Sequence, residues 1–355
     1  MGTLDTLVAT GEIGGRTVQI IETGDVVCAR YEPAPLPDGW VRIRTIRSAI
    51  SPGTEMTFYG RDATNVRLSK SWNPELRLFE SGAPSLDYPV TFGYRAAGVV
   101  EESRSASVAV GERIYGSWRH TEFTSMSAER AGLQLLPIDL SWDDSVDIGH
   151  MGPICVNAAA FGEGAERGLP AVVFGAGPVG LITAQVVRAN GAGPVYIVDR
   201  LASRLSIAET LGFTAVGAAA EDIARQLKEI HGSEAIPVAW ECTGSTAALN
   251  EAIRIVKRQG TVVAVGFYQG EAQGLHLGDE FHHNGVRIVS GQIGNIHSSL
   301  DMARLRARTL ELLQTGDVVL GRLPRLTLPV EDVARGFRAL ADHSSTLQVG
   351  LTYDG

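Results

Sequence analysis

The sequence has few cysteines, and their positions exclude two common kinds of stabilising chemistry. Cys28, Cys155 and Cys242 are the only three among 355 residues, and they are far apart. No pair has the Cys-x-x-Cys spacing of metal sites, so we expect neither a disulfide framework nor a cysteine-rich zinc site. A reducing, cytoplasmic location fits this pattern. The N-terminus also lacks the basic start and apolar core of a signal peptide.

Positive charge is scarce as well. Lys70, Lys228 and Lys257 are the only lysines, and the formal net charge is −9 at pH 7. This balance argues against nucleic acid or an anionic membrane as the main partner. With 44% hydrophobic and 20% charged residues, the chain has the composition of a globular protein rather than a largely disordered one.

One uncharged stretch, residues 168–187, is long enough for a membrane span. Glycine and proline interrupt it in the middle, at Gly175, Gly177, Pro178 and Gly180. We therefore expect a short buried strand, a glycine turn and a buried helix instead of a membrane helix.

The hydrophobic periodicity changes near residue 155. Before it the chain is rich in strand signals: in residues 40–48, Val41, Ile43 and Thr45 alternate with arginines until Ile46 breaks the pattern. After it, apolar runs alternate with helical stretches. The runs are 171–174, 195–198, 237–240, 261–265 and 287–290. This alternation predicts βαβ units with a parallel sheet, preceded by a β-rich domain.

The strongest motif is a G-x-G-x-x-G pattern formed by Gly175, Gly177 and Gly180, directly after an apolar run and at the start of a helical stretch. The first glycine permits a tight turn, the second lets the backbone approach a pyrophosphate, and the third lets helix and strand pack closely. The helix N-terminus then offers free N–H groups to phosphates. The pattern predicts a dinucleotide site.

Asp199 ends the next apolar run, 19 residues after Gly180. A carboxylate there can accept hydrogen bonds from ribose hydroxyls and would repel the 2′-phosphate of NADP, so NAD is favoured. Arg200 and Arg204 weaken this preference. Either arginine can stack on adenine, or pair with a phosphate if Asp199 turns away.

The order of several motifs resembles the medium-chain dehydrogenase/reductase superfamily over nearly the whole chain. The matching blocks are SPGTE (51–55), PVTFGYRAAGVV (89–100), VGERI (110–114), GAGPVG (175–180), ECTGS (241–245) and GTVVAVGFYQG (260–270). The resemblance implies a GroES-like β-rich catalytic domain and a Rossmann coenzyme domain with a doubly wound parallel sheet. It implies catalytic segments 1–155 and 291–355 around a coenzyme domain at 156–290, and a homodimer or homotetramer.

The zinc-ligand positions of that superfamily look altered. The first falls on Ser51 or Pro52, the histidine of the Gly-His-Glu motif becomes Tyr94, and the third falls near Gly152. None of these supplies the imidazole, thiolate or carboxylate that zinc needs. We therefore expect no metal. The blocks SPGTE and EFHHNGVRIVSGQIGN (280–295) are most similar to the branch that contains bacteriochlorophyllide a dehydrogenase.

Without zinc, a side chain must take up or supply the proton of the substrate hydroxyl. Tyr94 can contact the substrate oxygen, or simply fill the vacated space. Thr54 and Glu55 match a Thr-Asp relay pair of the family, although Glu55 can equally be a partner for Arg95. His120 is either a base or a hydrogen-bonded structural residue. Other polar candidates are His150, Asn157, His282, His283 and Gln292.

The resemblance also implies a set of coenzyme-binding residues. They are Gly175, Gly177, Pro178, Val179 and Gly180 at the pyrophosphate, Asp199, Arg200 and Arg204 at the adenosine, and Cys242, Thr243, Val265, Gly266, Phe267 and Gln292 near the rest of the coenzyme.

The sequence thus predicts a zinc-independent, NAD-dependent dehydrogenase. It would move a hydride between the nicotinamide and a secondary alcohol or ketone, for which a polyhydroxylated ring or a specialised metabolite is a candidate. The first alternative is an NADPH-dependent enoyl or quinone reductase of the metal-free type. The second is a non-enzymatic nucleotide-sensing or structural protein that keeps the coenzyme fold.

Overall fold

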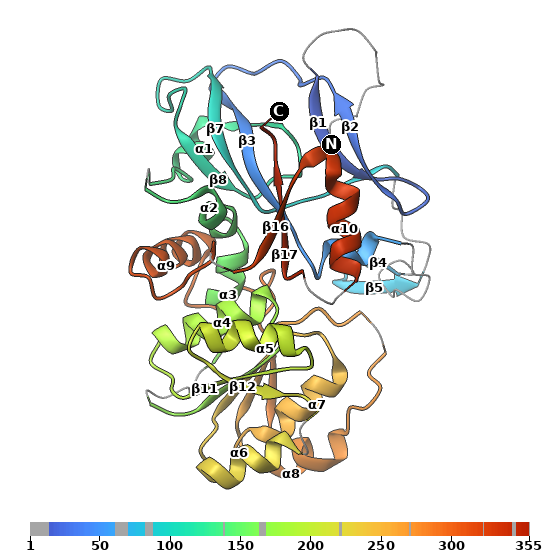
Figure 1. Cartoon of the computed structure of the whole chain (residues 1–355), viewed down its shortest axis with the longest axis vertical. Coiled ribbons are helices and arrows are strands. Elements are labelled where there is room, and N and C mark those ends of the chain that lie inside the picture. Colours follow the sequence, from blue (N-terminus) through green and yellow to red (C-terminus); the bar gives the residue numbers. More distant parts are fainter. Residues whose placement is uncertain are drawn as a thin grey trace. The chain divides into compact units, whose positions relative to one another are not determined.

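The chain forms two compact units, which are described separately below (Figure 1). A computed structural model describes residues 14–60, 70–81, 88–137, 139–162, 168–219, 222–269, 271–321, 323–342 and 346–354. Unit 1 is drawn from Met1–Asp62, Pro84–Gly149 and Arg325–Gly355, and unit 2 from Ala63–Ala83 and His150–Pro324. The expected domain bounds, 1–155, 156–290 and 291–355, stay a prediction.

Unit 1 contains two β-sheets. Their strands are β1 (Gly15–Ile20), β2 (Val26–Tyr31), β3 (Trp40–Ile50), β6 (Val90–Thr91), β7 (Ala96–Ser103), β8 (Arg113–Gly116), β9 (Phe123–Ser127), β16 (Arg325–Pro329) and β17 (Gln348–Thr352). The larger sheet has the order β16-β17-β3-β7-β8, with β9 paired to β3, and the smaller has the order β2-β1-β6. The helical segments are η1 (Glu55–Phe58), α1 (Ala128–Gly132), α2 (Trp142–Ile148), η4 (Val330–Asp332) and α10 (Val333–Ala341).

Strand β3 shows why the alternating pattern had one irregularity. Val41, Ile43 and Thr45 are buried, as the period of two predicts. Ile46 is buried too, and the register of β3 against β7 shifts between Thr45 and Arg47. An irregularity of this kind, as in a β-bulge, lets two successive side chains face the core.

The C-terminal segment completes the core of unit 1. Phe337 and Leu340 of α10 join one hydrophobic cluster with Val18 and Ile20 of β1 and Val349 of β17. Because β17 lies between β16 and β3, the C-terminal strand is an internal strand of the larger sheet. Segments near the start and near the end of the described residues therefore share one core in unit 1.

A buried ionic network reinforces the same sheet. The Arg95 guanidinium, fully buried, donates to Asp147 Oδ1 at 2.7 Å and to Gln348 Oε1 at 2.7 Å. It also donates to the Ile50 carbonyl at 3.1 Å, while Arg325 donates to Asp147 Oδ2 at 3.2 Å. Burial lowers the pKa of Arg325, because desolvation disfavours its charged form. One buried carboxylate thus serves two guanidinium groups.

We expect Asp147→Ala to destabilise the protein strongly, because it leaves the guanidinium groups of Arg95 and Arg325 without their buried partner. Breaking a buried pair in this way costs about 3–5 kcal/mol. Urea-induced unfolding measures the change. Arg225→Ala is the control: its pair with Glu229 is exposed, so its unfolding curve should match the wild type. An unchanged curve for Asp147→Ala would show that the network is energetically neutral.

Unit 2 contains a six-stranded parallel sheet. Its strands are β10 (Ala171–Phe174), β11 (Val195–Asp199), β12 (Thr214–Gly217), β13 (Val238–Glu241), β14 (Thr261–Ala264) and β15 (Arg287–Ser290). The order is β12-β11-β10-β13-β14-β15, so the direction of winding reverses between β10 and β13. The five apolar runs of the sequence become strands, and β12 is an additional one. The parallel sheet is as expected.

Helices cover both faces of this sheet (Figure 1). The helical segments of unit 2 are α3 (Met151–Ala160), α4 (Pro178–Ala189), α5 (Ala202–Thr210), α6 (Ile223–His231), α7 (Thr246–Ile255), η3 (Leu277–Phe281), α8 (His282–Asn284) and α9 (Met302–Gln314). Helices α4 and α5 lie on one side and α6 and α7 on the other. A two-stranded sheet of β4 (Lys70–Asn73) and β5 (Leu78–Ser81) is separate.

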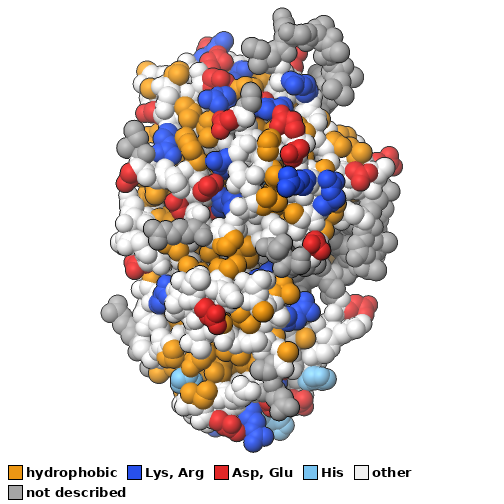
Figure 2. All heavy atoms as spheres, in the orientation of Figure 1, with side chains coloured by type: hydrophobic (Ala, Val, Ile, Leu, Met, Phe, Trp, Pro, Cys, Tyr) orange, Lys and Arg blue, Asp and Glu red, His pale blue; other side chains and the backbone are white. Residues whose placement is uncertain are grey.

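Two expectations about surfaces can be compared with the structure. Residues 168–187 form β10, a turn and most of α4, and among the described residues no helix has the length and apolar character to cross a bilayer. On the face drawn in Figure 2, acidic and basic side chains are interspersed among the described residues.

Candidate functional site

The glycine turn of unit 2 is built by close backbone contact. Gly175 has φ +100°, and a Cβ on Gly180 would lie 1.7 Å from the Gly175 carbonyl oxygen, so both positions require glycine. Gly177 is different, because a Cβ there would meet nothing within 4 Å. Gly177 is the N-cap of α4 and Pro178 its first residue, so free N–H groups of the first turn adjoin this open space. The geometry fits a pyrophosphate.

Asp199 connects the second strand to this turn. It is the last residue of β11, and its Oδ2 accepts a hydrogen bond from the Ala176 N–H at 2.7 Å. Its Oδ1 accepts from the Leu201 N–H at 2.9 Å. Each oxygen keeps further acceptor capacity, so the carboxylate can also receive ribose hydroxyls. Arg200 is exposed and Arg204 half-buried, and neither makes an ion pair with a described residue.

The loops after β13 and β14 meet the same turn. A Cβ on Gly175 would lie 2.8 Å from Thr243 Cγ2, and one on Gly266 would lie 2.1 Å from the Gly244 nitrogen. Burial raises the pKa of Cys242 well above its usual value, so its thiol stays protonated. Val265, Gly266 and Phe267 follow β14 directly. The predicted coenzyme residues from four strands therefore gather at the carboxyl edge of the sheet, where open α/β sheets bind ligands.

Sequence reasoning missed one residue of this group, Glu241. It is the last residue of β13 and fully buried, and its carboxylate accepts hydrogen bonds from the loops after β13 and β14. A signal was present, because an acidic residue at the end of the apolar run 237–240 has to be buried or to face the site.

Five further polar candidates take other positions. Asn157 is buried, and its amide is used by Gly291, Asn295 and the His297 N–H, so it is a structural residue. Gln292 is exposed and accepts from the Gly294 N–H. His282 and His283 form α8 before β15, at the amino edge of the sheet, away from the coenzyme loops. His150, just before α3, is half-buried.

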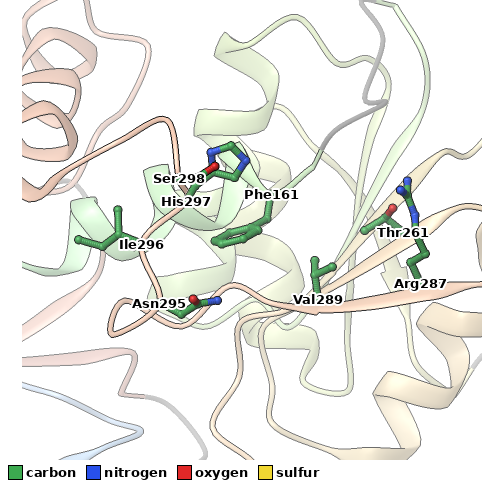
Figure 3. A pocket seen from close by; sticks show the side chains of 8 residues that line it. All are labelled: Phe161, Thr261, Arg287, Val289, Asn295, Ile296, His297 and Ser298. Carbon is green, nitrogen blue, oxygen red and sulfur yellow. The ribbon is translucent and has the colours of Figure 1, made fainter.

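A pocket of about 360 Å³ lies beside β15 and is lined in part by residues 295–298, which follow that strand (Figure 3). Thr261 and Arg287, the first residues of β14 and β15, lie together on one side, and Phe161 and His297 line another. None of the residues that line this pocket belongs to the glycine turn.

Unit 1 brings together the residues predicted for catalysis. Segment η1 begins at Glu55, shortly after β3 ends, and places Ser51, Thr54 and Glu55 beside Tyr94. The Tyr94 hydroxyl donates to Ser51 Oγ at 2.5 Å, and the Thr54 side chain also hydrogen-bonds Tyr94. His120 Nε2 lies 2.9 Å from Glu55 Oε2. We call these five residues the hydroxyl–carboxylate cluster.

Burial decides what each member can do. Burial first, and then the charge of Glu55, raise the pKa of Tyr94, so Tyr94 is a neutral phenol at neutral pH. Glu55 is 2% exposed, and its Oε1 has no hydrogen-bond partner among the described residues. Arg95, the alternative partner expected for Glu55, binds Asp147 instead.

His120 is fully buried, and both of its ring nitrogens are occupied. Its Nδ1 lies 2.8 Å from Ser48 Oγ, which lies 2.9 Å from the Tyr353 hydroxyl. This geometry favours a role in positioning Glu55 over direct contact with a substrate.

The same geometry bears on zinc. Ser51 and Tyr94 present protonated hydroxyls bonded to each other, and a Cβ on Gly152 would lie 2.2 Å from Thr309 Cγ2. Zinc prefers imidazole, thiolate or carboxylate, so these residues do not fit a catalytic zinc ion. In the part of the chain that the structure describes, no three His, Cys, Asp or Glu side chains are grouped to hold a metal.

Comparison with known proteins finds similarity to dehydrogenases. Residues 178–307 match the family "Zinc-binding dehydrogenase". The chain is 27% identical to D-guloside 3-dehydrogenase of Shigella flexneri over 288 residues, which cover 76% of this chain and 79% of that protein. It is 30% identical to sorbitol dehydrogenase 1 of Saccharomyces cerevisiae over 185 residues, 49% of this chain and 48% of that protein.

Solved structures agree in fold. The 2R,3R-butanediol dehydrogenase of Bacillus subtilis has a TM-score of 0.76 at 21% identity, covering 96% of this chain and all of that one. A short chain alcohol dehydrogenase of E. coli CFT073 complexed with NADH has a TM-score of 0.75 at 18% identity, covering 96% and 99%. A putative zinc-binding dehydrogenase of Sinorhizobium meliloti bound to NADP has 0.71 at 18%, covering 96% and 100%.

These matches support the medium-chain dehydrogenase/reductase superfamily. The expected fold class is confirmed: a GroES-like β-rich domain together with a Rossmann coenzyme domain. The superfamily relatives also support an oxidoreductase that acts on CH–OH groups of a small-molecule alcohol and uses a nicotinamide coenzyme.

We expect Gly177→Ala to weaken coenzyme binding without lowering stability. Its new methyl group would occupy the open space beside the N-terminus of α4, where the pyrophosphate has to approach. Titration of NADH fluorescence and a thermal melt measure the two effects. Gly132→Ala is the matched control, because its Cβ also meets nothing within 4 Å but lies in α1 of unit 1. Unchanged affinity in Gly177→Ala would place the phosphates elsewhere.

Proposed function

We propose that this protein is a zinc-independent, NAD-dependent dehydrogenase that interconverts a secondary alcohol and a ketone. The observation that carries the proposal is the hydroxyl–carboxylate cluster, which combines a phenol, two aliphatic hydroxyls and a buried carboxylate at the altered zinc-ligand positions. Relatives named for guloside, arabinitol and sorbitol support a polyhydroxylated substrate. A specialised metabolite with a hydroxylated ring is a candidate within that class.

The cluster can manage the substrate proton without a metal. The half-buried Tyr94 hydroxyl binds the substrate oxygen, and Ser51 accepts the Tyr94 proton. During oxidation Tyr94 and Ser51 orient the substrate oxygen, and the substrate O–H proton is transferred to the Glu55 carboxylate, whose Oε1 has no hydrogen-bond partner among the described residues. His120 holds the other oxygen of Glu55 in place. The nicotinamide coenzyme, when bound, exchanges the hydride with the carbinol carbon.

NAD is the proposed coenzyme because of Asp199. Its two bonds to backbone N–H groups fix the carboxylate at the end of β11, so it does not turn away from the adenosine side. A fixed negative charge there opposes a 2′-phosphate. Arg200 and Arg204 stay available to contact the adenosine.

The proposal includes four further predictions from the sequence. They are similarity to the branch that contains bacteriochlorophyllide a dehydrogenase, the three domain segments, a homodimer or homotetramer, and a cytoplasmic location. The proposed coenzyme residues remain those at the carboxyl edge of the sheet, with Gln292 at its margin.

A titration with NAD(H) and NADP(H), with zinc measured on the same untagged sample, tests the proposal. We expect NADH to bind more tightly and zinc to be far below one atom per chain, because Asp199 opposes the 2′-phosphate and the residues at the zinc-ligand positions, Ser51, Tyr94 and Gly152, supply no zinc ligand. Asp199→Asn should reduce the preference for NADH by removing the charge. Tighter NADPH binding would instead favour an enoyl or quinone reductase, and stoichiometric zinc would contradict the metal-free mechanism.

Glu55→Gln should lower kcat by about 10²–10⁴-fold, the usual contribution of a general base, and leave the NADH dissociation constant unchanged. Tyr94→Phe should also lower kcat. Because the pKa of Tyr94 is raised, its ionisation should cause no loss of activity below pH 10 in the wild type. Steady-state kinetics over pH measures these effects.

Glu122→Gln is the control for Glu55→Gln. Glu122 is a carboxylate of unit 1 that pairs with Arg16, outside the cluster, so kcat should stay near the wild-type value. If Glu55→Gln keeps full kcat, Glu55 is not the proton acceptor.

A further inference from the structure

The Glu241 carboxylate has an unusual environment for a buried charge. Oε1 accepts hydrogen bonds from the Thr243 N–H at 2.7 Å and from the Thr243 hydroxyl. Oε2 accepts from the Gly244 N–H at 3.1 Å and from the Tyr268 hydroxyl at 2.5 Å. No described Lys, Arg or His forms an ion pair with it. Four hydrogen bonds, and no opposite charge, hold this carboxylate.

These bonds join the loop after β13 to the loop after β14 at the carboxyl edge of the sheet. Thr243 and Gly244 belong to the loop after β13, and Tyr268 belongs to the loop after β14. The Glu241 main-chain carbonyl adds to the connection, because it accepts from the Val265 and Gly266 N–H groups at 2.8 and 2.9 Å. One residue thus fixes both loops.

The connection extends to the glycine turn through Thr243. A Cβ on Gly175 would lie only 2.8 Å from Thr243 Cγ2. The Thr243 side chain therefore packs directly against the glycine turn. Because the Thr243 hydroxyl donates to Glu241 and accepts from the Ser245 N–H, that side chain is fixed as well. The place where the direction of winding reverses, between β10 and β13, is where ligands bind in such sheets.

Burying the Glu241 carboxylate without an opposite charge costs desolvation free energy. Burial raises the pKa of Glu241 although its hydrogen bonds lower it, so burial disfavours the charged form of this side chain. A raised folded-state pKa means that this group contributes most stability below its unfolded pKa, and that the contribution is lost as pH rises. Stability at neutral pH does not account for a carboxylate at this position.

We propose that Glu241 is a positioning residue that holds the loops after β13 and β14 in their coenzyme-binding arrangement. This inference rests on the proposed use of a nicotinamide dinucleotide. A carboxylate is suited to the task because it is acceptor-only and can receive all four donors together. An amide replaces one acceptor oxygen with an NH₂ group, so a backbone N–H of residue 243 or 244 loses its partner.

The test is Glu241→Gln, measured by NADH fluorescence titration, thermal melting and kcat at saturating coenzyme. We expect the NADH dissociation constant to rise about tenfold, equivalent to about 1.4 kcal/mol. The melting temperature should change little, because the removal of a buried charge offsets the loss of one N–H···O bond, and the KM for the coenzyme should rise more than kcat falls. Tyr268→Phe, which removes one donor, should raise the dissociation constant less.

Asp147→Asn is the control, since it neutralises a buried carboxylate of unit 1. It should lower stability and leave NADH affinity unchanged. Wild-type affinity in Glu241→Gln overturns the inference while the proposed function stands. A loss of affinity that only follows a loss of stability also overturns it. If the wild type binds neither NAD(H) nor NADP(H), the proposed function and this inference both fail.

Discussion

Close backbone contact at the carboxyl edge of the parallel sheet constrains everything else in unit 2. Strand β10 and helix α4 approach so closely that a Cβ on Gly180 would overlap the Gly175 carbonyl, and Gly244 and Gly266 touch in the same way. Backbones this close leave N–H groups that need acceptors. Two carboxylates meet part of that need: Asp199 binds the N–H of the glycine turn and Glu241 binds those of the next loop.

Unit 1 meets a different requirement, which is to give the buried polar groups of the hydroxyl–carboxylate cluster hydrogen-bond partners. Tyr94 and Ser51 satisfy each other, and Glu55 is bonded to His120. Arg95, next to Tyr94, is directed into a separate network with Asp147 and Gln348. Tyr94 therefore belongs to the candidate catalytic cluster, whereas Arg95 belongs to the network that stabilises the larger sheet.

Features that depend on nearby residues could be predicted from the sequence. The glycine turn and Asp199 follow from spacing within one βαβ unit, and the apolar runs give the strands. The sequence left the role of His120 open between a base and a structural residue, because that role depends on Ser48 and Glu55, which are far from it in the sequence. The sequence marks Glu241 as an acidic residue at the end of an apolar run, but it does not show that Tyr268 donates to it from the loop after β14.

The position of β17 has a consequence for the order in which the protein folds during synthesis. Because β17 lies between β16 and β3, the larger sheet of unit 1 lacks an internal strand until residues 348–352 have left the ribosome. Until then the Arg95 guanidinium has no Gln348 to bind, although Asp147 is already present. The sheet of unit 2 lies wholly within residues 171–290, so it can form earlier. The unit that begins first in the sequence is therefore completed last.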